Sequence, residues 1–308
     1  MAFRSGFVSI LGRPNVGKST LLNALVGQKL AIVSPKPQTT RNRILGILEV
    51  PPQKNRPAGQ VILIDTPGVH KPDSSLGRTM MAEVRQALAG CDLLLLMVDA
   101  TEKFGREDGF GLELAKHSRT PVLLLLNKID RIAQKDRLLP IIEDYRQRHD
   151  FREIIPLSAR TREGLDRLLE ALLKDLPEGP RYFPADQITD QPVRFMAAEI
   201  IRQQVVLATS QEVPYAVAVV IEEFEESEKL TRVAATIHCE REGQKRILVG
   251  RHGQMLKKIG TAARSEIETL VGTRVYLDLF VKVSPLWRES KPFLEELDWR
   301  RRWVEGRG

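Results

Sequence analysis

Short runs of apolar residues alternate with segments of helical periodicity through the first half of the chain. Runs with almost no polar position are typical of strands buried on both faces of a parallel sheet. They cover residues 7–11, 61–64, 93–98, 122–126 and 154–157. Helical patterns fall between them, at residues 20–26, 79–89, 107–117, 135–149 and 163–175. The alternation predicts an α/β domain over residues 1–176, with a doubly wound, mostly parallel sheet.

Residues 42–50 break this alternation. They form a strand-like segment, but only the proline-rich and polar segment 51–59 separates them from the apolar run at 61–64. Such a short connection predicts a hairpin, because two parallel strands need a crossover of a dozen or more residues. We therefore expect one antiparallel strand in the sheet. The hairpin tip at 51–59 matches no function that the sequence indicates.

The pattern changes around residues 177–191, where prolines and glycine cluster as in a linker. Beyond it, residues 192–308 predict a smaller α+β domain that ends in a tail. Its expected order is α-β-β-α-β around one antiparallel sheet, with a short basic strand at the edge before the second helix. These elements cover residues 192–208, 215–224, 231–240, 245–249, 253–270 and 275–283.

Composition and charge narrow the class of protein. The chain has 308 residues and a formal net charge of +7, which favours an anionic partner. Basic residues cluster without acids between 244 and 264, while acids gather at 222–228. No apolar run approaches the ~20 residues of a membrane span, and no secretory signal precedes the first strand. The two cysteines lie far apart in apolar stretches, so we expect free thiols in a reducing cytosol. The histidines show no spacing typical of a zinc site.

The loop after the first apolar run carries the most specific motif, a complete G-x-x-x-x-G-K-[ST] between a strand and a helix. Backbone N–H groups at such a helix start close around phosphates. Lys18 can reach the β- and γ-phosphates, and Ser19 Oγ can ligate Mg²⁺. A simple glycine turn is the competing interpretation, which eight matching residues in this context disfavour. The predicted phosphate-binding residues are Gly12, Arg13, Pro14, Asn15, Val16, Gly17, Lys18, Ser19 and Thr20.

Two further segments are candidates for the γ-phosphate and the metal ion. Asp65, Thr66, Pro67 and Gly68 follow an apolar run, at the strand end where ligands bind in open α/β sheets. Asp65 can hold Mg²⁺, the Gly68 N–H can face the γ-phosphate, and Thr40 can reach the metal from a mobile segment. Each segment alone could be an ordinary turn or loop. The predicted metal ligands are Ser19, Thr40 and Asp65, and the predicted catalytic groups are Lys18, Thr40 and Gly68.

The segment after the run at 122–126 is a candidate for the base. Asp130 can accept from guanine N1–H and the N2 amino group, a pair of donors that adenine lacks. Asn127 can bridge the base and the phosphate loop, and the Lys128 stem can cover the ring. Ser158 and Ala159 follow the last run, where a backbone N–H can face guanine O6. A solvated loop is the alternative for each motif alone, but all of them in this order indicate guanine nucleotides.

A second glycine-framed loop lies in the basic part of the second domain. Gly250, Arg251, His252 and Gly253 form a Gly-x-x-Gly, the signature with which KH domains clamp about four nucleotides through the backbone. The motif alone is more often just a turn. The basic surroundings and the order of elements favour RNA, with predicted contacts at Lys245, Arg246, Gly250, Arg251, His252, Gly253, Lys257 and Lys258.

Together these motifs resemble the TrmE–Era group of bacterial GTPases, and nearly the whole chain resembles the Era family. The resemblance rests on residues 12–19 with 38–41, and on residues 247–260 around the Gly-x-x-Gly loop. It implies a P-loop GTPase domain that converts GTP to GDP and phosphate with Mg²⁺, followed by a type II KH domain. It also implies binding near the 3′ end of 16S rRNA and a role in assembly of the small (30S) ribosomal subunit.

Two positions bear on the rate of hydrolysis. Val69 stands where Ras-like GTPases carry the glutamine that orients the attacking water. We therefore expect slow intrinsic hydrolysis and name no side-chain general base. Asn15 matches the asparagine that helps to hold K⁺ beside the phosphates in related GTPases, so K⁺ is an expected activator.

Two other functions remain open from the sequence. One is a tRNA-modification GTPase of the TrmE kind, although such proteins are longer and lack the Gly-x-x-Gly domain. The other is an RNA-binding scaffold whose nucleotide is structural. We expect a cytoplasmic monomer that binds no DNA, and a peripheral contact with the inner face of the cell membrane stays open. The basic tail at 299–303 is either a helix end that docks its tryptophans or a further RNA contact.

Overall fold

The computed structural model describes every residue except 1, 35, 37–38, 55 and 301–308. It divides into two compact units. The first unit comprises Met1–Val33, Pro37–Pro72 and Thr79–Asp190, and the second comprises Ser34–Lys36, Asp73–Arg78 and Gln191–Gly308. Each unit is described by itself below.

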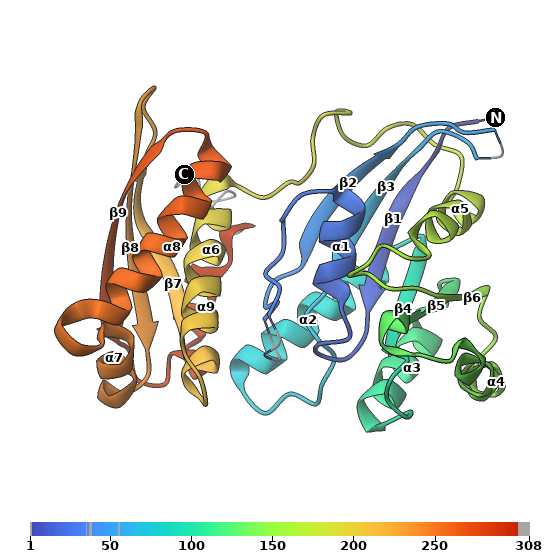
Figure 1. Cartoon of the computed structure of the whole chain (residues 1–308), viewed down its shortest axis with the longest axis horizontal. Helices are drawn as coiled ribbons and strands as arrows, with labels where there is room; N and C mark the ends of the chain where they lie inside the picture. The colour runs from blue at the N-terminus through green and yellow to red at the C-terminus, as the bar shows by residue number, and fades with distance from the viewer. Residues whose placement is uncertain (1, 35, 37–38, 55, 301–308) are drawn as a thin grey trace. The chain divides into compact units, whose positions relative to one another are not determined.

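A six-stranded sheet forms the centre of the first unit (Figure 1). Its order is β2-β3-β1-β4-β5-β6, and all neighbours are parallel except β2 and β3, as the hairpin prediction requires. Every residue of β3, β4 and β5 is buried, which explains why these segments contain so few polar residues. The strands are β1 Arg4–Leu11, β2 Ile44–Val50, β3 Gly59–Asp65, β4 Leu93–Asp99, β5 Val122–Asn127 and β6 Glu153–Pro156.

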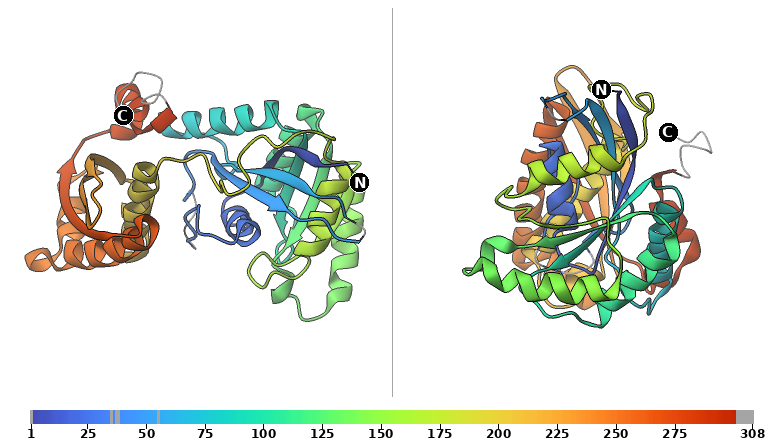
Figure 2. Two further views of the ribbon diagram at one scale, coloured as in Figure 1. Left: turned by 90° about the horizontal axis from the view of Figure 1, so that it is seen from above. Right: turned by 90° about the vertical axis from the view of Figure 1, so that its right-hand side faces the viewer.

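Helices cover both faces of this sheet (Figure 2). Helices α2, α3 and α4 bury Val84, Leu112 and Tyr145 against β4 and β5 on one face. Helices α1 and α5 contact strands β2, β3 and β6 on the other face. The doubly wound α/β fold is therefore confirmed. The helices are α1 Lys18–Val26, α2 Ser75–Ala89, α3 Arg106–Ser118, α4 Leu138–Arg148 and α5 Leu165–Asp175.

The predicted linker is bonded to the first unit along most of its length. The Ser5 N–H donates to the Pro177 carbonyl at 3.1 Å, and the Ile47 N–H donates to the Ile188 carbonyl at 2.8 Å. Residues up to 190 consequently belong to the first compact unit. The domain bounds expected from the sequence stay a prediction, but this segment is not a free tether.

The second unit is a three-stranded sheet with helices packed on it. Helices α6, α7 and α8 lie on one face, where Ile201, Leu248 and Ile259 are buried in a common core. Trp287 is buried in a separate small cluster, and its Nε1–H donates to the Ala216 carbonyl at 2.9 Å. The elements are α6 Val193–Ala208, β7 Ala218–Glu225, β8 Leu230–Cys239, α7 Glu242–Val249, α8 Gln254–Val271, β9 Arg274–Val283 and α9 Lys291–Leu297.

The short basic strand expected at 245–249 is wrong, because these residues belong to helix α7. Gln244, the third residue of α7, caps the start of the helix: its side-chain oxygen accepts from the N–H groups of Glu240 and Arg241 at 2.9 and 3.1 Å. Leu248, one turn later, is fully buried, whereas Ile247 is 46% exposed. Residues 247–249 are all apolar and therefore resemble a strand. The buried Gln244, which caps the helix start, is the signal that these residues are helical.

The expected antiparallel sheet is wrong at one of its two edges. Strand β7 is antiparallel to β8, but β9 is parallel to β8, with Leu230 opposite Arg274. Two helices, α7 and α8, connect β8 to β9, and such a long crossover returns the chain to the end from which β8 started. The order is therefore α-β-β-α-α-β. Among the described residues, no helix is long and apolar enough to cross a membrane.

Candidate nucleotide site and RNA-binding loop

The predicted phosphate loop connects the end of β1 to the start of α1. A Cβ at Gly17 would lie 2.3 Å from Asn127 Nδ2, and the φ of Gly17 is +110°. A Cβ at Gly12 would lie 2.3 Å from the Met97 carbonyl oxygen. Both positions thus exclude any side chain, so the loop packs against β4 and β5 through bare backbone.

Lys18 bridges this loop from within. Its Nζ donates to the carbonyls of Gly12 and Arg13 at 2.9 and 3.0 Å. Burial lowers the pKa of Lys18 to about 8, although the nearby Asp65 works in the opposite direction. A phosphate group in the loop would give this buried ammonium a direct anionic partner in addition to the nearby Asp65.

The three predicted metal ligands meet at one point. Ser19 Oγ donates to Asp65 Oδ2 at 2.6 Å, and it lies 2.9 Å from Thr40 Oγ1. Burial raises the pKa of Asp65 to about 6, while Lys18 and the hydrogen bonds from Ser19 and Thr40 work to lower it. Asp65 Oδ1 is buried and has no hydrogen-bond partner in the described part of the chain. Two hydroxyls and a carboxylate with a vacant oxygen fit Mg²⁺, which prefers oxygen ligands.

Position 69 contributes no polar side chain to this point. Val69 is fully buried, and its N–H donates to the Gly12 carbonyl at 3.1 Å. A Cβ at the preceding Gly68 would lie 2.7 Å from the Pro14 ring, so the backbone approaches the phosphate loop closely. The apolar side chain of Val69 cannot orient an attacking water.

Asn127 joins the base segment to the phosphate loop, as the sequence predicts. Its Nδ2 donates to the Val16 carbonyl at 2.6 Å. Its Oδ1 accepts from the Ala159 N–H at 2.9 Å. The Ala159 N–H is thus engaged by Asn127. The contact of a backbone N–H of residues 158–159 with guanine O6 stays a prediction.

Asp130 is held as a carboxylate by two donors. Its Oδ1 accepts from Ser158 Oγ, and its Oδ2 accepts from Arg160, both at 2.7 Å. The Ser158 hydroxyl, helped by the Arg160 charge, keeps the pKa of Asp130 below its usual value. The Ser158 hydroxyl therefore orients the Asp130 carboxylate. Arg160 was not predicted, because nothing in its local sequence indicates a charge partner.

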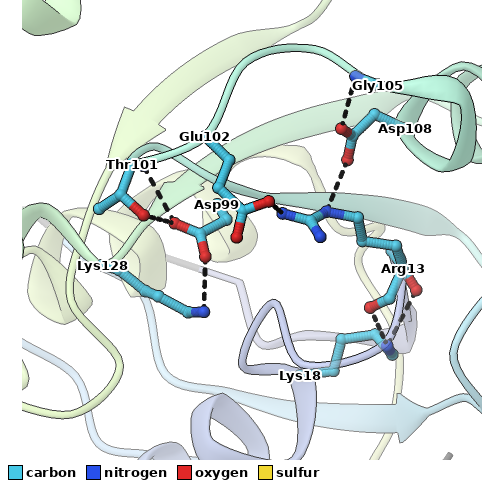
Figure 3. A network of polar contacts seen from close by, with 9 residues as sticks. Arg13, Lys18, Asp99, Thr101, Glu102, Gly105, Asp108 and Lys128 are labelled. Atoms are coloured by element: carbon cyan, nitrogen blue, oxygen red, sulfur yellow. Dashed lines mark hydrogen bonds and ion pairs between the residues drawn. The ribbon is translucent and has the colours of Figure 1, made fainter. Parts of the chain in front are cut away.

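Three ion pairs extend the site to β4, to the loop after it and to α3 (Figure 3). Lys128 Nζ pairs with Asp99 Oδ2 at 2.6 Å. Arg13 donates to Glu102 at 2.5 Å and lies 3.3 Å from Asp108. The Arg13 side chain is thus tied to the start of α3, which leaves its backbone for phosphates. Asp99 could have been found, because it ends a buried parallel strand at the same edge as the other motifs.

The Gly-x-x-Gly loop of the second unit is a short turn between α7 and α8. Gly250 and Gly253 have φ values of +72° and +77°. A Cβ at Gly250 would lie 2.7 Å from Met255 Cβ, whereas a Cβ at Gly253 would meet no atom within 4 Å. Gly250 is therefore required by packing, while Gly253 leaves open space in front of the backbone.

Basic side chains surround this open loop. Arg251 and His252 are exposed at its tip, and Lys257 and Lys258 are exposed on the first turns of α8. Arg246 is exposed on α7, and Lys245 lies 5.7 Å from the centre of the Phe280 ring. All eight predicted RNA contacts lie on α7, on the Gly-x-x-Gly turn or on the first turns of α8. Their role in binding RNA stays a prediction.

Each half of the chain matches a known protein family. Residues 7–128 match the family described as "50S ribosome-binding GTPase", and residues 212–288 match the family described as "KH domain". The two matches fall in different compact units, one on the nucleotide site and one on the Gly-x-x-Gly loop.

Similarity to characterised proteins extends over nearly the whole chain. GTPase Era of Geobacter metallireducens is 50% identical over 297 residues, which cover 96% of this chain and 97% of the relative. GTPase Era of Syntrophus aciditrophicus is 49% identical over 296 residues, which cover 96% and 94%.

Solved structures give the same result. Era with MgGDPNP and nucleotides 1506–1542 of 16S ribosomal RNA has a TM-score of 0.92 and 40% identity, covering 96% of this chain and 99% of the other. An Aquifex aeolicus Era variant bound to GDP·AlF4⁻ has a TM-score of 0.91 and 41% identity, with the same coverage. Full-length identity near one half, on a GTPase fold joined to a KH fold, leaves one conclusion: this chain belongs to the Era family of GTPases.

Proposed function

We propose that this protein is a GTP-dependent switch that binds the 3′ end of 16S rRNA and acts in assembly of the small ribosomal subunit. The observation that supports the proposal best is the presence of two prepared sites on one chain. One is a guanine-nucleotide constellation at strand ends, and the other is an open, basic Gly-x-x-Gly loop. The related Era structure holds both a guanine nucleotide and a 16S rRNA fragment.

The nucleotide chemistry follows from the residues that meet at the phosphate loop. Ser19, Thr40 and Asp65 would hold Mg²⁺, which neutralises charge on the β- and γ-phosphates when bound. Lys18 would exchange its carbonyl partners for phosphate oxygens and stabilise charge that develops on the transferred group. Water is the nucleophile, and hydrolysis is slow because Val69 cannot orient it.

Potassium is the proposed activator of this slow reaction. Asn15 lies in the phosphate loop with a φ of 62°, next to the backbone that would surround the phosphates. A monovalent cation there supplies positive charge that an arginine finger supplies in other GTPases. Turnover should be faster in potassium than in sodium buffer at equal ionic strength. Equal rates in the two buffers would reject K⁺ activation without affecting the rest of the proposal.

The switch is tested by measuring RNA affinity in three nucleotide states. A 3′-terminal 16S rRNA oligonucleotide is titrated with the full-length protein bound to a non-hydrolysable GTP analogue, bound to GDP, and without nucleotide. We expect affinities that differ by about 5–150-fold between the first two states, the usual range of coupling between sites. By reciprocity, RNA should tighten GTP binding by the same factor. Three equal affinities would contradict a switch even if both ligands bind.

Two rival functions give different results in simple assays. An RNA-binding scaffold with a structural nucleotide would show no turnover of GTP. A tRNA-modification GTPase of the TrmE kind would prefer tRNA to the 16S oligonucleotide, and the full-length match to Era argues against it. The proposal extends to a monomer in the cytoplasm that binds no DNA and whose contact with the membrane, if made, is peripheral.

A further inference from the structure

A second pocket lies in the first unit, far from the nucleotide site. Its volume is about 840 Å³, and its walls are the starts of β1 and β6, the turn at 56–57 and helix α5. In Figure 1 this end of the sheet lies beside the label N. The phosphate loop follows the opposite end of β1, which has eight residues. A strand of that length separates the two sites by about 25 Å. We call this cavity the amino-end pocket.

Arg56, in the hairpin tip that the sequence left without a function, lines the amino-end pocket. The residue is only 6% exposed, and its Nε is buried without a hydrogen bond. No ion pair or side-chain hydrogen bond joins Arg56 to any residue in the described part of the chain. Its backbone, in contrast, is fixed by two hydrogen bonds with Gln53, at 2.9 and 3.1 Å. A buried guanidinium without a counter-charge is costly, because burial removes the water that would solvate it.

The other charges of the pocket do not neutralise Arg56. Arg4 pairs with Glu178 at 3.3 Å. Arg167 donates to Glu153 at 3.0 Å. These two pairs cancel within the pocket wall and leave Arg56 as the buried charge without a partner.

The two remaining charged residues of the pocket lie on helix α5. Glu170 and Lys174 both line the pocket, are exposed, and lie four residues apart on one face of the helix. Their formal charges also sum to zero, so the amino-end pocket carries one net positive charge. Arg56 is the most buried of its charged residues.

We propose that the amino-end pocket binds a small anionic ligand whose phosphate or carboxylate group pairs with Arg56. The planar guanidinium fork matches either group through two parallel hydrogen bonds. A volume of this size is typical of small-molecule sites. The proposal gives residues 56 and 57 of the hairpin tip a role as one wall of a binding site, and it is independent of the nucleotide and RNA sites.

The test follows the Arg56 side chain itself by NMR. Full-length protein with ¹⁵N-labelled arginine is saturated with Mg·GDP, so that the phosphate loop is occupied. The Arg56 Nε–Hε signal is assigned by its absence in Arg56→Met. Inorganic phosphate and citrate are then titrated to millimolar concentrations, with sodium chloride at matched ionic strength as the reference. We expect a saturable shift with one or both anions. The phosphate and citrate arms show which anionic group the pocket prefers.

A signal that does not move with either anion, or that moves equally with chloride, overturns the proposal. Matched variants supply a second readout that does not depend on the NMR signal. Arg56→Met should lower affinity for the preferred anion about tenfold or more, since it removes charge-assisted hydrogen bonds. Arg137→Met removes an exposed arginine outside the pocket and should bind the anion as the wild type does.

The stability of the same variants separates a binding role from a structural one. Without added anion, Arg56→Met should be at least as stable as the wild type, because an unpaired buried charge is gone. Added anion should raise the melting temperature of the wild type and of Arg137→Met only. A large loss of stability in Arg56→Met, with no effect of the anion on the wild type, would show that the guanidinium serves the fold and would overturn the proposal.

Discussion

The chain contains two loops that are framed by glycines and precede a helix. One is closed by its own hydrogen bonds, and the other is open. The loop at 12–19 is closed on itself, since Lys18 donates to its carbonyls and the Asn127 side chain donates to it from the end of β5. The loop at 250–253 is open, with exposed side chains and empty space in front of Gly253. A buried site for a small, highly charged ligand needs its donors fixed in advance, whereas a clamp on a polymer needs room for a backbone to approach.

The largest expected effect concerns the recognition of the guanine base by Asp130. Asp130→Asn should weaken GTP binding about 100-fold, because two hydrogen bonds to a charged group contribute about 1.5 kcal/mol or more each. It should favour xanthosine triphosphate, whose C2 carbonyl can accept from the new amide. Equilibrium titrations with both nucleotides measure the change. The exposed Asp136 provides the control, Asp136→Asn, which should bind GTP normally. Unchanged GTP affinity in Asp130→Asn would remove Asp130 as the reader of the base.

The next prediction concerns a side chain placed in the open space at Gly253. Gly253→Asp should abolish detectable binding of the 16S oligonucleotide, because a side chain blocks the backbone approach and its charge repels phosphates. GTP affinity should stay unchanged. Gly272→Asp is a matched control. Gly272 directly follows α8, has a φ of +73°, and a Cβ there would meet no atom within 4 Å. If both variants lose RNA binding equally, the loss reflects charge or strain rather than the loop.

A third prediction separates the two glycines of the open loop. Gly250→Ala should lower the free energy of unfolding of the second unit by about 3 kcal/mol, since its Cβ collides with Met255 in a strained conformation. Gly253→Ala should cost about 1 kcal/mol, the penalty of a left-handed φ alone. All three tryptophans lie after residue 286, so tryptophan fluorescence during urea unfolding reports on the second unit. Equal losses would mean that the two positions are packed alike.

The smallest expected effect concerns the tail. Replacing Arg300, Arg301 and Arg302 with alanine should flatten the salt dependence of RNA binding, with a change in logarithmic slope of about 2 if all three contact phosphates. Residues 301–308 lie outside the described part of the chain, and Trp299 packs 5.9 Å from Phe195. An unchanged slope with unchanged stability would favour the docked helix end over an RNA contact.

The two loops also differ in how far sequence alone could describe them. The phosphate loop was predictable residue by residue, because its motif requires a strand before it and a helix after it. The elements around Gly250 were not, since the helical state of 245–249 depends on a buried glutamine and on packing against a distant strand. Arg160 and Glu102 were missed because their partners lie 30 and 89 residues away in the sequence, where local pattern carries no signal. Asp99 was missed although its place at the end of a buried parallel strand could have indicated it.

The bonded linker has a consequence for the lifetime of the protein in a cell. A protease must draw several residues into its active site as a free extended strand, and such segments are usually exposed loops. Arg181 lies in a segment whose sequence suggests an easy target, yet its guanidinium pairs with Glu49. The next two N–H groups donate to the Gln60 side chain at 2.9 and 3.0 Å. We therefore expect residues 181–183 to resist cleavage for as long as the first unit stays folded, which helps to keep the two activities on one polypeptide.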